Sequence, residues 1–137
     1  MTTVLVVSHD LDLADGEADS LRRHGYDVRQ CLGPIGGHCP VLADRPCSTV
    51  EGVDVLVYDA FATGEPEGAR RLIEGLRDHH PEVPIVVCAS GMEPEWIETI
   101  GDHGITPLVG QPTGARMAAA IEAAVALGHA RRALPVA

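Results

Sequence analysis

The sequence predicts an α/β fold, a three-layer sandwich in which helices cover both faces of a five-stranded parallel sheet. Five short apolar runs recur along the 137 residues, and helical patterns lie between most of them. Strands that alternate with helices pair in parallel, because each parallel pair needs a crossover connection. Most of the runs are apolar throughout, which is typical of a sheet covered on both faces. The expected strands are 3–7, 26–31, 53–58, 84–88 and 105–109.

Apolar residues at helical spacing predict the helices between these strands. The first pattern spans residues 11–21, with Asp10 as its cap and Gly25 at its end. A second pattern spans residues 69–76, and a shorter one covers 96–100. These positions fill three of the four connections that a five-stranded parallel sheet requires.

The ends of the later helices carry residues with expected local roles. Thr113 is placed to cap the final helix, whose apolar face covers residues 117–125. His79 and His80 close the second helical pattern, where cations favour the helix dipole, and we expect both side chains to be solvated. The tail, residues 129–137, is expected to fray.

A segment without helical character replaces the helix expected between the second and third strands. Residues 32–52 contain three prolines and several glycines, which disfavour a regular helix. We therefore expect a single domain over residues 1–137 with the flavodoxin-like strand order 2-1-3-4-5, in which an irregular loop stands in place of the second helix.

The composition excludes several classes of function. The formal net charge is -10, and an acidic chain repels phosphate backbones and anionic lipid, so we expect neither a nucleic acid nor a membrane as partner. No stretch reaches the ~18 apolar residues of a membrane span, and the start, MTTVLVVSHD, lacks the features of a signal peptide. We therefore expect a cytoplasmic protein.

No motif in the chain predicts catalysis. The segment after the first strand, SHDLDLADG, contains no glycine-rich phosphate cradle, and GPIGG precedes no expected helix. Neither a nucleophile elbow nor a Ser-His-Asp set is supported by the spacing. We therefore expect that the protein is not an enzyme.

The third strand ends on an acid, which is the main candidate for a functional residue. The stretch DVLVYDA brings Asp59 to the carboxyl end of an apolar strand. Ligands of doubly wound folds bind outside this edge of the sheet. The fold can therefore present a carboxylate there without burying it.

This order of elements and the acid at Asp59 resemble a response-regulator receiver domain, over residues 4 to about 127. In that family an acidic pair after the first strand holds Mg²⁺, and an aspartate at the end of the third strand accepts a phosphoryl group from a histidine kinase. A hydroxyl after the fourth strand and a lysine after the fifth bind the phosphoryl oxygens. The resemblance therefore implies a signalling role.

Matched to that pattern, the chain keeps the phosphoacceptor position, Asp59, and changes its neighbours. The other pocket positions carry Ser8 and His9 in place of the acidic pair, Asp10 one step later, Ala89 in place of the hydroxyl residue, Ser90 next to it, Gln111 in place of the lysine, and Pro112 on its proline. A serine and a neutral imidazole are poor Mg²⁺ ligands, and a glutamine carries no charge. The resemblance therefore implies an atypical receiver with an incomplete phosphorylation site.

Two interpretations of Asp59 follow. In the first, it is a phosphoacceptor, and Asp10 leans inward so that both carboxylates hold Mg²⁺. In the second, it is an inherited acid that caps a loop or accepts hydrogen bonds from backbone amides. His9 stands beside Asp59 in this arrangement and can pair with that carboxylate.

The loop carries three evenly spaced cysteines. Seven residues separate Cys31 from Cys39 and Cys39 from Cys47, and His38 precedes the middle thiol. Three thiols and an imidazole suit a tetrahedral zinc site. Two alternatives stay open: a reversible disulfide that makes the loop a redox switch, and thiols that act as small apolar packing residues. Cys88 lies within the fourth strand and is expected in the core.

Two functions are therefore predicted. The first is a stand-alone atypical receiver that acts in two-component signalling or a phosphorelay through protein contacts, with a kinase or a downstream effector as partner. The resemblance also implies a homodimer formed through the last helices and strand. The alternative is a metal-binding or thiol-redox sensor that uses Cys31, His38, Cys39 and Cys47 on a receiver scaffold.

Overall fold

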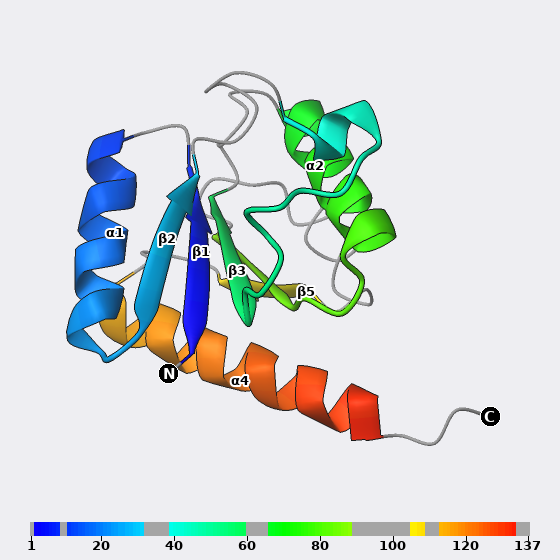
Figure 1. Ribbon diagram of the computed structural model, residues 1–137. Helices are drawn as coiled ribbons and strands as arrows, with labels where there is room; N and C mark the ends of the chain where they lie inside the picture. Colours follow the sequence, from blue (N-terminus) through cyan, green and yellow to red (C-terminus); the bar gives the residue numbers. More distant parts are fainter. Residues whose placement is uncertain are drawn as a thin grey trace.

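A five-stranded parallel sheet forms the centre of the protein. The computed structural model describes residues 2–8, 11–31, 39–59, 66–88, 105–108 and 113–133. The strands are β1 (Thr3–Val7), β2 (Asp27–Cys31), β3 (Val55–Asp59), β4 (Ile85–Cys88) and β5 (Ile105–Leu108). They pair in parallel in the order β2-β1-β3-β4-β5 (Figure 1). The predicted fold class and strand order are confirmed.

Helices cover both faces of this sheet. The α1 (Leu11–Arg23) and α4 (Gly114–Ala133) helices lie on one face, and α2 (Pro66–His79) lies on the other (Figure 1). A short 3-10 turn, η2 (Val41–Ala43), packs beside α2. The layers are therefore those of the predicted three-layer sandwich.

Two hydrophobic cores fill the spaces between the layers, and alternate strand residues feed each of them. Leu5 of β1 and Leu56 of β3 point toward α2, whereas Val4 and Val55 point toward α1 and α4. The α2-side core consists of Leu5, Val7, Val41, Val50, Val53, Leu56, Tyr58, Leu72, Ile73, Leu76, Val83, Ile85, Val87 and Ile105. Because both strand faces are buried, the central strands carry continuous apolar runs.

The first helix ends at Gly25 for a conformational reason. Gly25 has φ 94°, a left-handed conformation that glycine adopts without strain. The N–H of Tyr26 donates to the carbonyl of Leu21, and the N–H of Gly25 donates to that of Arg22. This Schellman pattern satisfies the last carbonyls of α1 and turns the chain into β2.

The final helix begins as its sequence predicts. The N–H of Arg116 donates to Oγ1 of Thr113 at 3.3 Å, which is the expected cap. Its inner face carries Met117, Ile121 and Ala124, which belong to the core between the sheet and the α1 and α4 helices. The helix continues to Ala133 and thus includes the first residues of the stretch 129–137 that the sequence leads us to expect as a fraying tail.

Other expected features differ from the structure or lie beyond it. Part of the loop that we expected to be irregular forms the 3-10 turn η2. Asp44 follows its last residue and has a left-handed conformation with φ 60°. The short helix expected at residues 96–100 lies outside the described residues. Within the described ranges, no helix combines the length and hydrophobicity needed to cross a bilayer.

Candidate functional site at the carboxyl edge of the sheet

The register of the sheet brings Asp59 to its carboxyl edge. Tyr58 pairs with Val7 of β1, and Asp59, the last residue of β3, pairs with Cys88 of β4. Asp59 is therefore at the end of the central strand, with a neighbouring strand on either side. This backbone position is the one that the sequence predicted for the candidate residue.

Ser8 lies at the same edge and is fully buried. It follows β1 directly, its side chain and backbone have 0% exposure, and its N–H donates to the carbonyl of Cys31 at 3.1 Å. This bond extends the pairing of β1 and β2 by one residue. A neutral, fully buried serine therefore occupies the place where the resemblance implies an acidic metal ligand.

This environment does not supply a Mg²⁺ site in the part of the chain that the structure describes. Mg²⁺ prefers carboxylate and water oxygens in octahedral geometry, and the buried hydroxyl of Ser8 offers neither charge nor access to water. No three acidic, histidine or cysteine side chains are grouped as metal ligands among the described residues. The Mg²⁺ pair of Asp10 and Asp59 stays a prediction.

Most of the predicted pocket lies outside the described residues. These positions are His9, Asp10, Ala89, Ser90, Gln111 and Pro112, together with His38 of the loop. For Asp59 the structure describes the backbone position. The pocket assignments therefore stay predictions.

The cysteines of the loop pack against hydrophobic residues. Cys31, Cys39 and Cys47 are each half-buried against the α2-side core, and none of the three forms a disulfide. The described residues do not gather them into a group of three metal ligands. Their contacts are those of small apolar side chains, so the zinc and redox hypotheses gain no support from this arrangement. Cys88 is buried in the other core, as predicted.

The sequence did not predict how the loop attaches to α2. We expected His80 to be solvated, and this was wrong: His80 is only 4% exposed. Its Nε2 accepts a hydrogen bond from the N–H of Cys47 at 2.9 Å, across 33 positions of the chain. A buried histidine therefore holds the backbone of the loop.

Neighbouring residues of α2 make two more contacts with the loop. Nε2 of His79 lies 2.9 Å from Oδ1 of Asp44. Val41 packs so closely on Gly75 that a Cβ built on this glycine would lie 2.6 Å from Val41 Cγ1. A glycine inside a helical stripe was the one sequence signal that could have indicated this close approach.

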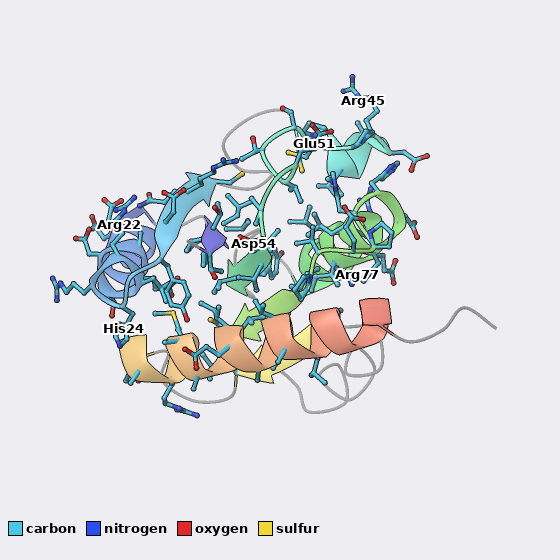
Figure 2. All side chains as sticks on the ribbon, turned by 60° about the horizontal axis from the view of Figure 1, so that its bottom comes forward. Arg22, His24, Arg45, Glu51, Asp54 and Arg77 are labelled. Atoms are coloured by element: carbon cyan, nitrogen blue, oxygen red, sulfur yellow. The ribbon has the colours of Figure 1, made fainter. Side chains whose placement is uncertain are left out.

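Arg77 holds the turn that leads from α2 into β4. Its guanidinium donates to the carbonyls of His80 and Pro81 at 3.5 and 3.4 Å, and to that of Val83 (Figure 2). These carbonyls belong to the end of the helix and the following turn, where intrahelical partners are lacking. The position of His80 is therefore fixed from two sides, by Arg77 and by Cys47.

Comparisons with solved structures identify the arrangement. A response regulator receiver domain protein from Clostridium thermocellum superposes with a TM-score of 0.75 at 13% identity, covering 96% of this chain and 99% of that one. The receiver domain of NtrX from Brucella abortus gives 0.71 at 19% identity, with 90% and 98% covered. This chain has the fold of a response-regulator receiver domain.

The receiver fold also occurs in a further neighbour of different description. A putative pilus assembly protein, CpaE, from Burkholderia thailandensis gives a TM-score of 0.72 at 18% identity, covering 92% of this chain and 99% of that one. Against the longer NtrX chain in complex with ADP, the present chain spans 28% of the length. No protein-family model and no curated protein matches the sequence.

Within the receiver fold, residues 39–53 occupy the connection between the second and third strands. Figure 1 shows this segment beside α2, on the opposite side of the sheet from α1. Figure 2 shows Arg45 and Glu51 on its outer side, and both are exposed. The segment thus has an apolar inner side, a charged outer side and polar attachments to α2.

Proposed function

We propose that this protein is a signalling module of the response-regulator type, which acts through contacts with a kinase or a downstream effector. The observation that carries the proposal is the position of Asp59 at the carboxyl end of the central strand of a receiver fold. Its immediate neighbourhood is atypical, because Ser8 is neutral and fully buried. The proposal assigns the protein no catalytic activity of its own and a cytoplasmic location.

Asp59 is the candidate phosphoacceptor within this proposal. A phosphoryl group would leave a phosphohistidine of the kinase, breaking its N–P bond, and form a P–O bond with a carboxylate oxygen of Asp59. Phosphoryl transfer depends on positioning and on neutralisation of developing charge. Since Ser8 contributes no charge, we expect slow modification compared with a site that holds two further acids.

The test is incubation with acetyl phosphate followed by intact-protein mass spectrometry. The expected result is one phosphoryl group on the wild-type protein and none on Asp59→Asn. Asp27→Asn is the matched control and should leave the modification unchanged. Asp27 is an exposed acid at the amino end of β2, so it lies at the opposite edge of the sheet from Asp59. A wild-type mass that stays unmodified in the presence and absence of Mg²⁺ would exclude the phosphoacceptor role.

A homodimer through the last helix is the second part of the proposal. Over residues 114–127 the outer side of α4 is mostly apolar: Ala115, Ala119, Ala123 and Ala126 are exposed beside Arg116 and Glu122, and Leu127 is 59% exposed. Leu127 is the exposed large hydrophobic residue of the described chain. Such a surface favours association, because burying it removes apolar area from water.

A further inference from the structure

The β2 strand forms one edge of the sheet, and its outer side faces no other strand in the part of the chain that the structure describes. The strand order places β2 beside β1 alone, next to α1 (Figure 1). An edge strand presents a row of backbone N–H and C=O groups to which a strand of another molecule can add. The outer edge of β2 is therefore open to pairing between molecules unless a side chain covers it.

The hydrogen bonds to β1 identify the residues of β2 whose backbone groups face outward. The carbonyl of Cys31 accepts from the N–H of Ser8 and thus points toward β1, and the N–H of Asp27 points the same way. Every second residue of a parallel strand bonds the same neighbour. The second and fourth residues of β2, Val28 and Gln30, therefore direct their N–H and C=O groups to the outer edge.

Arg22 of α1 covers the first of these outward carbonyls. Its Nη2 donates to the carbonyl of Val28 at 3.3 Å, which agrees with the outward direction of that carbonyl. Nη1 of the same side chain donates to Oδ1 of Asp19 at 3.4 Å, one turn earlier on the helix. Figure 2 shows Arg22 on α1 beside β2. The planar guanidinium thus bridges the helix and the edge of the sheet.

A second copy of β2 is the strand against which this arrangement acts most directly. Two copies would pair antiparallel about a twofold axis through Arg29, with Val28 opposite Gln30 of the second copy and two hydrogen bonds in each pair. Both pairs need the carbonyl of Val28 as an acceptor, and Arg22 occupies it. Arg29 would also lie opposite its own copy, and like charges in that position are destabilising.

We propose that Arg22 holds the outer edge of β2 closed against strand pairing with a second copy of this chain, and that Asp19 anchors its guanidinium. Loss of the side chain would uncover the carbonyl of Val28 and let two molecules extend their sheets into one. The inference depends neither on Asp59 nor on association through α4, so it can fail without affecting either of them.

The experiment is sedimentation velocity on the full chain over a range of concentrations, with Arg22→Ala as the test variant. The side chain of Arg22 is 48% exposed, so its removal should leave the core intact. We expect the dimer association constant to rise about tenfold, since two intermolecular hydrogen bonds gain an acceptor. Arg23→Ala is the matched control, because it removes the same charge from the exposed neighbour on α1 and should leave the constant unchanged.

Two further variants connect the association to the edge of β2. Gln30→Pro removes an outward N–H and leaves the bonds from β2 to β1, so adding it to Arg22→Ala should restore the wild-type constant. Asp19→Asn removes the anchor and should raise the constant in the same direction as Arg22→Ala. Asp15→Asn, at another exposed acid of α1, is its control and should not.

Amide hydrogen exchange gives a local readout that does not depend on the proline variant. In the Arg22→Ala dimer the amide of Gln30 should exchange more slowly than in the wild type, because the second copy would accept its hydrogen bond. Association through α4 would leave this amide unchanged. The proposal is overturned if Arg22→Ala and Arg23→Ala sediment alike at every concentration, or if Arg22→Ala associates without added protection of the Gln30 amide.

Discussion

Gly75 of α2 lies directly against Val41 in the loop of residues 39–53, which belongs to the connection between β2 and β3. A Cβ built on Gly75 would lie 2.6 Å from Val41 Cγ1 and 3.1 Å from the Val41 carbonyl oxygen. Glycine is unfavourable in a helix interior by about 1 kcal/mol relative to alanine. The close approach of the loop therefore accounts for a residue that the helix alone would disfavour.

Gly75→Ala is predicted to destabilise the protein although it improves helix propensity. The new methyl group must displace a stiff β-branched side chain and a backbone carbonyl, and such overpacking costs about 1–3 kcal/mol. Gly16 on α1 is the matched control, since nothing lies within 4 Å of a Cβ built there. Gly16→Ala should stabilise by roughly 0.5–1 kcal/mol.

Chemical denaturation of the two variants measures this difference. If Gly75→Ala is as stabilising as Gly16→Ala, the loop does not pack on α2 at this distance. Exchange protection of the Cys47 amide in Gly75→Ala gives a local readout, because a displaced loop would lose the bond to His80.

Asp54 joins the amino ends of two central strands, and its removal should weaken the sheet at that edge. The N–H of Thr3 donates to Oδ2 of Asp54 at 2.8 Å, and the N–H of Asp54 donates to the Thr3 carbonyl at 2.9 Å (Figure 2). Asp54→Ala should lower the free energy of unfolding by about 1 kcal/mol, since a charge-assisted bond is lost at an exposed site.

Asp27→Ala serves as the control for that substitution. Asp27 begins the neighbouring strand β2 and bonds Thr2 through its backbone amide, which the substitution retains. Its cost should therefore stay below that of Asp54→Ala. Equal stability of Asp54→Ala and wild type in urea denaturation would show that the Asp54 side chain does not hold β1 to β3.

The environment of Tyr26 leads us to predict that the folded protein loses stability at alkaline pH. Burial and, to a smaller extent, the negative charge of Glu122 raise the pKa of Tyr26 above its ordinary value of about 10. The folded state therefore holds the phenolic proton more tightly than the unfolded state. This contribution is complete below about pH 10 and is lost as pH rises from there through the raised pKa.

Tyrosinate absorbance measures this shift, because the chain contains only two tyrosines. Tyr26→Phe should remove the corresponding titration and make unfolding less sensitive to pH above about 10. Glu122→Gln should lower the pKa of Tyr26 only in part, since burial is the larger cause. If the pKa of Tyr26 returned fully to its ordinary value in Glu122→Gln, the charge of Glu122, and not burial, would be the larger cause.

The sequence predicted features that local spacing determines and missed those that depend on distant contacts. The strand Thr3–Val7 and the Thr113 cap follow from patterns within a few residues. The burial of His80 depends on Cys47, 33 positions away, and a histidine at a helix end gives no sign of that partner. Likewise, β3 begins at Val55 and not at 53, because pairing with β1 and β4 determines where the strand starts.

The candidate site was predictable only in outline. The apolar run before Asp59 placed its backbone at the carboxyl edge, because strand ends in a parallel sheet share one edge. The burial of Ser8 was not predictable, since it depends on the bond from its N–H to Cys31 of the adjacent strand. That bond makes Ser8 part of the sheet. The sequence pattern alone does not distinguish such a residue from an exposed loop residue.

Leu127→Glu is predicted to weaken self-association without affecting folding. Leu127 is 59% exposed on α4, so the monomer should tolerate the carboxylate, whereas a dimer formed through α4 would bury an unpaired charge. We expect the dissociation constant to rise at least about tenfold, which corresponds to about 1.4 kcal/mol. Gln30→Glu adds the same charge at an exposed position of β2 and should leave the constant unchanged. Sedimentation velocity over a range of concentrations measures both variants, and a wild-type protein that stays monomeric throughout would exclude the α4 dimer.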